Sequence, residues 1–534
     1  MTRTWRGAAA LGCVAVLMAV GGVASAGGGS QWVTAGGGLQ NTRSQPSERR
    51  ISVATVGGLV KKWEFTTGGD VSATPAVDGD TVYFPDWAGN LYAVDKATGA
   101  ERWHTTISSA TGITADKARA TPAITDTAVI IGTQGSIFVP GGGSGGNVLA
   151  FDKKTGALLW RTRVDEQFSA IITQSATVFD GRVFVGVASL EEALAGDPSY
   201  PCCSFRGSMA ALDVNTGAIL WKTYMSPATP SGYSGTAVWG SSPAIDQKRK
   251  SVYIATGNNY TVPGSVNECV AAALDPAAIA ACPAATDYFD SIMSLDYRTG
   301  AVKWATRAVP FDAWTTSCLP PPFGEGSNCP DPEGPDYDFG QAPALFTVKG
   351  ANGRLTELVG AGQKSGQYWA VKPDSGEVVW VTQAGPGGTA GGLQWGSSVD
   401  GTHVYTSNSN SLFKTWVLPD GSTTNLGVWS ALDAATGQIV WQRAETTPPG
   451  GIGIWGSTPG PTATANGVMF ACSMDALGHM YAFNGNTGEV LWSFASGGSC
   501  ISGAAISNGM VFWGSGYSNF GGGTSNNKVF AFGL

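Results

Sequence analysis

A 13-residue pattern of apolar and polar positions recurs seven times along the chain. Each copy begins with alternating apolar residues, passes through a polar turn and ends on tryptophan, as in Leu91-Tyr-Ala-Val-Asp-Lys-Ala-Thr-Gly-Ala-Glu-Arg-Trp103. The other copies span 148–160, 209–221, 292–304, 368–380, 429–441 and 480–492. Glycine occupies the ninth position and tryptophan the thirteenth in every copy, a regularity that predicts a repeat fold.

Each copy is typical of a β-hairpin. Period-two apolar residues predict a strand, the Asp-x-x-Thr-Gly turn contains a glycine that tolerates positive φ, and the residues before tryptophan predict the returning strand. A second hairpin precedes most copies, as at 74–84 and 502–512. Two hairpins make four strands, which is one blade of a β-propeller.

The two ends of the chain supply one further repeat. Trp63 follows no strand of its own, while residues 529–534 predict a strand with no tryptophan after it. We therefore predict an all-β, eight-bladed β-propeller closed by pairing of the N- and C-terminal strands, which leaves no blade edge open. The repeat tryptophans are expected to pack between blades rather than to touch a ligand.

The 534 residues would ordinarily suggest about three or four domains, but the repeats predict one propeller domain over residues 27–534. Its excess length falls in long loops at 190–208, 259–289 and 311–340, where a propeller carries function. Residues 1–26 resemble a secretory signal peptide, with a membrane anchor as the alternative. No other apolar run approaches the roughly 20 residues of a membrane span, so we expect a periplasmic or secreted protein.

Charge and composition exclude some classes of partner and of metal site. The formal charge of −8 becomes −10 once Arg3 and Arg6 leave with the signal, which disfavours nucleic acid or anionic lipid as partner. Three histidines are too few for a histidine-rich metal site. We expect the chemistry to come from carboxylates or from a bound cofactor.

Eight cysteines remain after Cys13, and an even number in an oxidising compartment favours disulfides. Sequence proximity suggests the pairs Cys269–Cys282, Cys318–Cys329 and Cys472–Cys500. The adjacent Cys202 and Cys203 could close a strained ring, remain two thiols or find other partners.

The tryptophan-terminated repeat resembles the quinoprotein alcohol dehydrogenases over essentially the whole mature chain. The resemblance implies a propeller that holds pyrroloquinoline quinone (PQQ) and a calcium ion and oxidises alcohol groups to carbonyls. Outer-membrane assembly scaffolds share the repeat without a cofactor, so a non-catalytic scaffold in cell-envelope assembly is the alternative. A lyase or sugar-binding propeller is a third hypothesis.

Asp312 is the candidate catalytic residue. The segment from Val309 to Trp314 is similar to the family's Pro-His-Asp-x-Trp, which implies that Asp312 is the general base and also a calcium ligand. Phe311 replaces the histidine of that motif, and Thr315 replaces the aspartate that often follows its tryptophan. The alternative is an aspartate that caps a loop turn.

Two further calcium ligands follow from the resemblance. Asn258 ends a Thr-Gly-Asn motif, and the family's Ser-x-x-Glu spacing selects Glu192, with Glu191 as the fallback or a solvated acidic pair as the alternative. The extra aspartate of the lanthanide-dependent variant is Trp314 here, which favours calcium.

The resemblance also implies a set of residues around the cofactor. Trp239 matches the floor under the quinone ring, and Lys364 matches the lysine that donates to the quinone oxygens, unless it is a surface lysine. Weaker matches are Arg119, Thr173 and Ser189 for the cofactor carboxylates, Trp455 beside the cofactor, and Cys202-Cys203 for the disulfide roof.

Within the family, the lean propeller, the signal and the Phe-Asp-x-Trp variant resemble the polyvinyl alcohol dehydrogenases. No Cys-x-x-Cys-His motif occurs, so the chain attaches no haem. The resemblance therefore implies an alcohol substrate and a separate cytochrome c as electron acceptor.

Overall fold

The computed structural model describes residues 1–2 and 31–534, apart from 137–138, 140–141, 144, 322 and 351. Residues 3–26 of the predicted signal, including Cys13, lie outside the described residues. The helices are short and lie in loops between strands: α1 (Ile107–Thr111), α2 (Glu191–Leu194), α3 (Gly264–Ala272) and α4 (Pro276–Ala280). Within the described residues, no helix is both long enough and apolar enough to cross a membrane.

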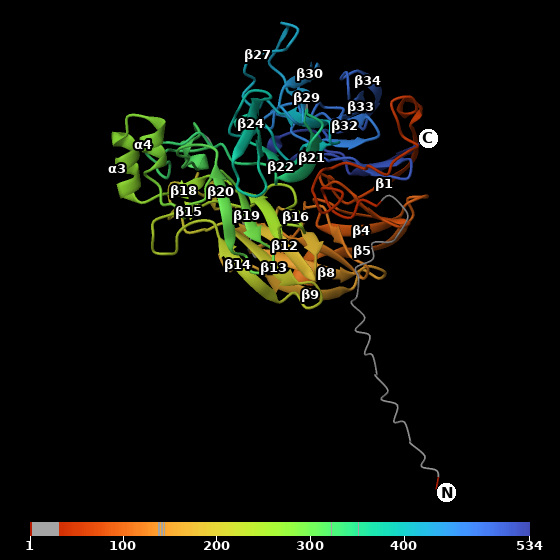
Figure 1. Cartoon of the computed structure of the whole chain (residues 1–534), viewed down its shortest axis with the longest axis horizontal. Helices are drawn as coiled ribbons and strands as arrows, with labels where there is room; N and C mark the ends of the chain where they lie inside the picture. The colour runs from red at the N-terminus through yellow and green to blue at the C-terminus, as the bar shows by residue number, and fades with distance from the viewer. Residues whose placement is uncertain (3–30, 137–138, 140–141, 144, 322, 351) are drawn as a thin grey trace.

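Eight antiparallel sheets form a ring of blades, which we number I to VIII in chain order (Figure 1). The strands of blades I to IV, from the inside outward, are β2 (Ala76–Asp78), β3 (Thr81–Pro85), β4 (Asn90–Asp95), β5 (Glu101–Thr106); β6 (Ala123–Ile124), β7 (Ala128–Gly132), β8 (Asn147–Asp152), β9 (Leu158–Arg163); β11 (Thr177–Phe179), β12 (Arg182–Ser189), β13 (Ser208–Asp213), β14 (Ile219–Tyr224); and β16 (Ala244–Asp246), β17 (Ser251–Ala255), β19 (Ser291–Asp296), β20 (Val302–Arg307). In blade III, β10 (Ala170–Ile171) also pairs with β12.

Blades V to VIII repeat this order. Their strands are β21 (Ala344–Lys349), β22 (Leu355–Gly362), β23 (Gln367–Val371), β24 (Val378–Gln383); β25 (Ser398–Val399), β26 (His403–Asn408), β29 (Val428–Asp433), β30 (Ile439–Ala444); β31 (Ala463–Ala465), β32 (Val468–Cys472), β33 (His479–Asn484), β34 (Val490–Ala495); and β35 (Ala505–Ser507), β36 (Met510–Ser515), β37 (Lys528–Gly533), β1 (Val60–Thr66). Two small ribbons lie outside the blades, β15 (Ser234–Gly235) with β18 (Asn259–Thr261) and β27 (Trp416–Val417) with β28 (Thr423–Thr424).

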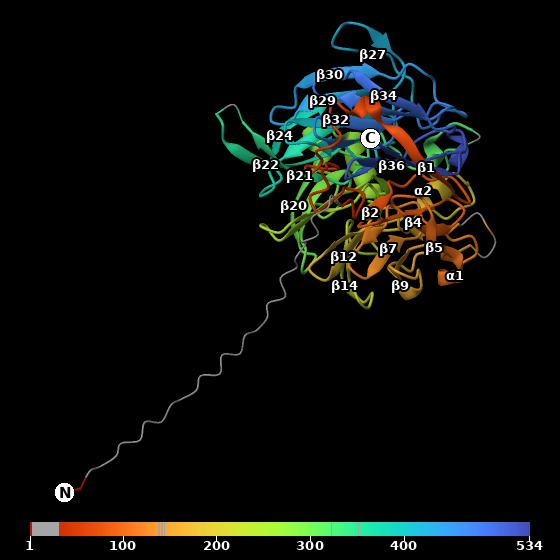
Figure 2. The same cartoon turned by 90° about the vertical axis from the view of Figure 1, so that its right-hand side faces the viewer.

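The predicted closure is confirmed, and with it the propeller. β1 pairs antiparallel with β37, with Trp63 opposite Ala531, so the first strand completes the blade that the last strand begins. Figure 2 shows the orange-red β1 beside the blue strands of the C-terminal region. Every blade thus has four strands, and the ring has no unpaired end.

The repeat tryptophans pack between blades, as predicted. Trp221 at the end of blade III lies against the turn glycine of blade IV, and its indole N–H donates to the Tyr297 carbonyl at 3.2 Å. That glycine, Gly300, has a φ of +74°, and a Cβ there would lie 2.5 Å from the Trp221 ring. Glycine is therefore required in the repeat for its conformation and for its lack of a side chain.

This arrangement predicts that Gly300→Ala lowers the free energy of unfolding by about 2–4 kcal/mol, because positive φ strain adds to overpacking of the indole. Gly79→Ala is the matched control, since Gly79 also has positive φ (+56°) but has open space where a Cβ would be. Its cost is expected to be about 1 kcal/mol. Urea unfolding of the two variants measures the difference, and equal losses would contradict a steric role for the tryptophan.

A segment ahead of the first blade runs round the inside of the ring. We call residues 32–45 the inner collar. They bond to residues at or beside the innermost strand of every blade in turn: Trp32 exchanges two bonds with Val77, Val33 accepts from Ile124, Thr34 donates to Ala176, Leu39 accepts from Ile245, Gln40 from Leu345, Thr42 from Val399, Arg43 from Thr464, and Gln45 donates to Ile506. Sequence analysis did not anticipate this element.

The three long loops contain part of the secondary structure that lies outside the blades. The loop 259–289 contains α3 and α4, which stand at the edge of the ring beside β15 and β18 (Figure 1). The loops 190–208 and 311–340 contact each other, because the Thr316 hydroxyl donates to the Glu192 carbonyl at 2.8 Å. The three pairs suggested by proximity form disulfides, and Cys202 forms a fourth with Cys203.

Candidate active site

Five carboxylates and one lysine gather where the loops of blades III, IV and V meet. Four of the carboxylates and the lysine are buried, and Glu192 is half-buried. The group comprises Glu192 after β12, Asp290 before β19, Asp312 after β20, Asp336 and Asp338 before β21, and Lys364 after β22. The ends of adjacent blades thus bring together residues from positions 192 to 364.

Asp338 connects the site. Its carboxylate accepts from the Trp239 indole N–H at 2.7 Å and from the Asn258 backbone N–H at 2.7 Å. The Lys364 ammonium lies 3.4 Å from the same carboxylate and 2.7 Å from that of Asp336. One buried aspartate therefore positions the predicted floor, a predicted metal ligand and the predicted cofactor lysine.

Asp312 is fully buried under the segment that leads to β21. Its two carboxylate oxygens accept from the backbone N–H groups of Asp336 at 3.1 Å and Tyr337 at 2.6 Å. Burial raises the pKa of Asp312 to about 6, against the lowering effect of hydrogen bonds from Asp290 and Tyr337. A carboxylate with such a pKa is suited to accept a proton near neutral pH.

The two adjacent glutamates of the loop 190–208 have different environments. The Glu191 carboxylate accepts from the Tyr200 hydroxyl and from the backbone N–H groups of Ser204 and Phe205. It therefore fixes the loop segment that contains Cys202-Cys203. Glu192 faces the cluster instead, and its Oε1 is buried without a hydrogen-bond partner. Burial raises the pKa of Glu192 to about 8; Lys364 opposes this shift, and the charges of Asp338 and Asp312 reinforce it.

Asn258 presents an oxygen to the same space. Its side-chain N–H₂ donates to the carbonyls of Asn259 at 3.0 Å and Trp314 at 2.8 Å, which leaves Oδ1 as the available atom. Asp290 is fully buried beside Asp312, and burial raises its pKa well above the usual value. The unpartnered Glu192 oxygen and several buried carboxylates beside a single ammonium group fit a bound divalent cation, because such a cation prefers oxygen ligands.

The Trp239 indole provides a flat surface beside these groups. The Lys364 ammonium lies 5.7 Å from the ring centroid, and Trp395 meets the ring edge-on at 5.3 Å between centroids. Cys203 of the vicinal disulfide packs in the same apolar cluster as Trp239. Both side chains therefore pack against one apolar cluster, although they come from different loops.

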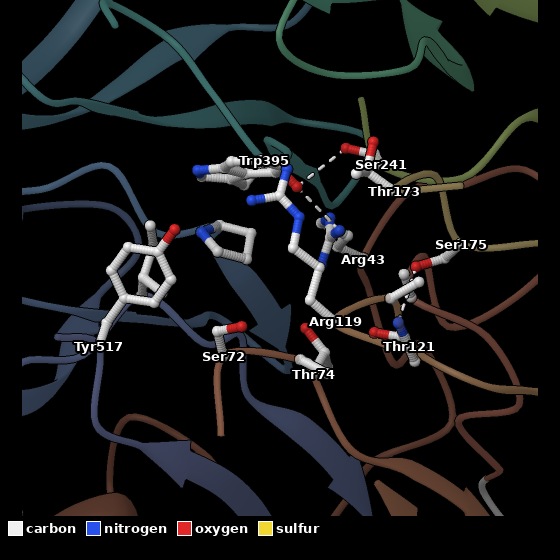
Figure 3. A pocket seen from close by; sticks show the side chains of 15 residues that line it. Arg43, Ser72, Thr74, Arg119, Thr121, Thr173, Ser175, Ser241, Trp395 and Tyr517 are labelled. Atoms are coloured by element: carbon white, nitrogen blue, oxygen red, sulfur yellow. Dashed lines mark hydrogen bonds between the residues drawn. The ribbon is translucent and has the colours of Figure 1, made fainter. Parts of the chain in front are cut away.

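The other predicted cofactor residues divide into two groups. Arg119 and Thr173 line a cavity of about 60 Å³ inside the ring (Figure 3). The Thr173 hydroxyl donates to the Trp239 carbonyl at 3.2 Å. Trp455 packs edge-on against Tyr517, another residue that lines this cavity. Ser189 does not line it, because its hydroxyl bonds to that of Ser169 and to the Glu191 N–H.

Sequence analysis missed four residues of this site, namely Asp290, Asp336, Asp338 and Trp395. The signal that could have found two of them is the pair Asp336-x-Asp338 ahead of a blade's first strand, in a chain with only 13% charged residues. Trp395 has a φ of +62°, contacts the Trp239 ring and also lines the cavity, and no residue pattern predicts that backbone conformation.

Comparison with known proteins identifies relatives over most of the chain. A family model described as outer membrane protein assembly factor BamB matches residues 20–306 and 425–530. Two polyvinylalcohol dehydrogenases are each 31% identical: the one from Pseudomonas sp covers 91% of this chain and 73% of its own length, and the one from Sphingopyxis sp. (strain 113P3) covers 90% and 73%. The crystal structure of a quinohemoprotein alcohol dehydrogenase from Comamonas testosteroni matches 94% of this chain and 80% of its own at a TM-score of 0.68 and 19% identity, which shows the fold.

The part of the chain outside the family model contains most of the site. Asp312, Asp336, Asp338, Lys364 and Trp395 all lie between residue 306 and residue 425. The matched parts are the repeats of blades I to IV, the outer two strands of blade VI, and blades VII and VIII. Glu192 and Asp290 of the carboxylate cluster lie inside the matched part, whereas Asp312, Asp336 and Asp338 lie outside it.

Proposed function

Because the chain belongs to the family of PQQ-dependent quinoprotein alcohol dehydrogenases, we propose that it oxidises secondary hydroxyl groups, including those of polyvinyl alcohol, to carbonyls. The observation that carries the proposal is the group of Asp312, Lys364 and Trp239 around Asp338. It joins a buried base, a cation and a flat aromatic surface in one site. This combination suits a planar, anionic quinone with an alcohol beside it.

The residues of the site have separable roles in this proposal. Asp312 accepts the proton of the substrate hydroxyl, since it is a buried carboxylate of the cluster whose pKa, at about 6, leaves it ionised yet basic near neutral pH. Trp239 supports the cofactor ring, and Asp338 fixes the indole through its N–H. The Lys364 ammonium, 5.7 Å from the centroid of the Trp239 ring, would supply positive charge to a cofactor bound against that indole. When bound, PQQ supplies the two-electron acceptor and a calcium ion the Lewis acid that polarises it.

Calcium would be held by Glu192, Asn258 and Asp312. The adjacent Glu191 and Glu192 provide a matched pair of variants that tests the assignment of Glu192 as a ligand. Glu192→Gln is expected to weaken calcium binding by about tenfold or more, because it removes a charged oxygen ligand. Glu191→Gln changes the neighbouring residue in the same way but removes a group that already has protein partners.

Titration of chelator-treated protein with calcium, followed by calorimetry, measures both variants. Glu191→Gln is expected to keep the calcium affinity within about threefold of wild type while it lowers the melting temperature. If Glu191→Gln loses calcium and Glu192→Gln retains it, the ligand assignment is wrong.

The electron acceptor in this proposal is a separate cytochrome c, and the location is the periplasm or the cell exterior. The absence of Cys-x-x-Cys-His supports the first point, since the chain has no motif for attached haem. The four disulfides support the second, because structural disulfides persist in oxidising compartments.

A cell-envelope scaffold is the second candidate, and the description of the matching family model favours it. The free-energy cost of burying the carboxylate cluster argues against this candidate. Several carboxylates buried beside one lysine destabilise a fold unless a bound group compensates them. A scaffold has no use for that arrangement, whereas a metal- and cofactor-dependent enzyme requires it.

Reconstitution separates the two candidates. Purified protein is mixed with PQQ and calcium, and reduction of an artificial dye is followed with polyvinyl alcohol, 2-propanol and ethanol. We expect turnover with the secondary alcohols that disappears when either PQQ or calcium is omitted. Absence of both PQQ binding and dye reduction with every alcohol would exclude the enzyme.

A further inference from the structure

Exposed apolar side chains gather at the end of the ring that holds the candidate active site. In an antiparallel blade, the loops after the second and fourth strands lie at one end, and the turns after the first and third strands lie at the other. Glu192 follows a second strand and Asp312 follows a fourth, so the site lies at the first end. The large apolar residues that are at least 40% exposed in the connections at this end are Phe168, Leu274, Phe323, Leu412, Phe413, Val417, Ile452 and Leu477.

The opposite end of the ring differs. Among the described residues, its turns contain no exposed large apolar side chain, and the exposed Leu355 belongs to β22 rather than to a turn. Leu158 and Leu159 of β9 are exposed on the circumference, at the two positions before a repeat tryptophan, and blades III, V and VI expose apolar residues at the same positions. Those residues belong to the repeat, whereas the exposed residues at the site end do not.

One group of these side chains lies against the loop that contains the two adjacent glutamates. The Phe168 ring, which is 51% exposed, lies 6.2 Å from the Tyr200 ring between centroids, and the Tyr200 hydroxyl donates to Glu191 at 2.8 Å. Phe323 is 59% exposed, and its segment packs on the same loop, because a Cβ at Gly196 would lie 2.8 Å from the Phe323 carbonyl oxygen. Aromatic residues from three loops thus lie beside the glutamate that faces the cluster.

A second group lies beside the backbone of Lys364. Leu412 is 50% exposed, and a Cβ at Gly388 would lie 3.0 Å from its Cγ, while the Gly388 N–H donates to the Lys364 carbonyl at 3.1 Å. Phe413 and Ile452 continue this group, since a Cβ on the glycine after Ile452 would lie 3.2 Å from the Phe413 Cζ. The chain then enters the ribbon of β27 and β28, which projects from the ring (Figure 1 and Figure 2).

We propose that these two groups bind the chain of a polymeric secondary alcohol on both sides of the hydroxyl that is oxidised. We call them the apolar rim, which consists of Phe168, Tyr200, Phe323, Leu412, Phe413 and Ile452. The reaction itself rests on the proposed function. The rim adds a binding surface for the substrate outside the buried carboxylate cluster.

The position and the chemistry of the rim favour a polymer over a small alcohol. The cluster is largely buried and receives one hydroxyl, so a linear chain must leave the site in two directions. Tyr200 belongs to blade III and Leu412 to blade VI, with the loops of blades IV and V, which hold most of the site, between them. Apolar side chains suit the methylene groups of the chain, and an uncharged polymer is not repelled by the formal charge of −8. A small alcohol ends inside the site and leaves the rim without a contact.

The first test compares dye reduction by reconstituted protein with polyvinyl alcohol and with 2-propanol. We expect Leu412→Ser to raise the KM for the polymer by about fivefold and to leave the KM for 2-propanol within about twofold, because only the polymer reaches the rim. The double variant Phe323→Ser/Leu412→Ser removes contacts on both sides, and its KM for the polymer is expected to rise by about tenfold or more.

Leu159→Ser is the matched control. It changes the same residue type at nearly the same exposure, 51% against 50% for Leu412, on β9 outside the rim, and should leave both KM values unchanged. An equal rise in the KM values for polymer and 2-propanol in the rim variants would overturn the proposal, because the rim would then only shape the pocket. A loss of rate seen only when cytochrome c replaces the dye would also overturn it, because the surface would then bind a protein.

The second test requires no turnover. The chain is run without added cofactor in native gels with and without polyvinyl alcohol, and binding to the polymer retards the band. We expect the polymer to retard wild type and Leu159→Ser but not the double variant. Each protein is compared with itself, so a change in shape does not mimic the result.

The two tests separate failure of the rim from failure of the proposed function. Retardation that is lost in the double variant supports the rim even when no alcohol is oxidised. Turnover of 2-propanol together with equal retardation of all three proteins overturns the rim and leaves the proposed function intact.

Discussion

Replacement of Asp312 by asparagine is expected to lower dye-coupled alcohol oxidation by at least about a thousandfold while PQQ remains bound. Removal of a general base costs about a hundred- to ten-thousandfold by itself. Asp312 is in addition a proposed calcium ligand, so the variant loses charge at the metal as well. Asparagine is nearly isosteric and can still accept from the Tyr337 N–H, which limits the structural change.

The measurement is steady-state dye reduction with a secondary alcohol, alongside PQQ absorbance of the gel-filtered protein. The absorbance separates loss of chemistry from loss of cofactor. Asp126→Asn changes an exposed aspartate and serves as the control. Activity of Asp312→Asn within tenfold of wild type, with PQQ bound, would remove Asp312 from the proposed mechanism.

The second large effect is expected from the inner collar. Removal of residues 31–45 should abolish folding, because the collar bonds to all eight blades and contains Trp32, which has no exposed surface. Each net hydrogen bond contributes about 1 kcal/mol, and loss of a buried tryptophan costs about 3–5 kcal/mol. Their total is comparable with the whole stability of a typical domain, about 5–15 kcal/mol.

Circular dichroism and size exclusion of a chain that begins at residue 46 test this expectation. A chain that begins at residue 31 is the control and should fold normally. Trp32→Ala offers a milder version, with an expected loss of about 3–5 kcal/mol in urea unfolding. If the chain from residue 46 melts like the control, the collar merely lies on the ring without supporting it.

Much of the architecture could be predicted because the same strand, turn and tryptophan positions recur in every repeat. Gly300 and Trp221 occupy fixed positions of that repeat, and their contact recurs between blades. The closure by β1 and β37 followed from counting incomplete repeats at the two ends. Three disulfides followed from proximity along the chain, and Cys202–Cys203 was one of several open alternatives.

The site was harder to predict because its residues share no pattern. Asp312, Asn258 and Trp239 were found through resemblance to family motifs, and their roles stay predictions until the variants are measured. Asp338 matches no such motif, yet it contacts Trp239, Asn258 and Lys364 at once. The contacts of Asp338 with Trp239 and Asn258 join residues 99 and 80 positions apart, so they depend on how the blades meet, and no local pattern contains that information.

The sequence by itself determined the number of blades, the way the ring closes and the glycine turns on which the tryptophans pack. These follow from local rules, since strand alternation, turn conformation and repeat length act over a few residues. Only the tertiary structure decided that Glu192 rather than Glu191 faces the cluster, that the inner collar reaches every blade and that Arg43 enters the cavity. Those outcomes depend on which buried groups find partners across the ring, and burial is a property of the assembled fold.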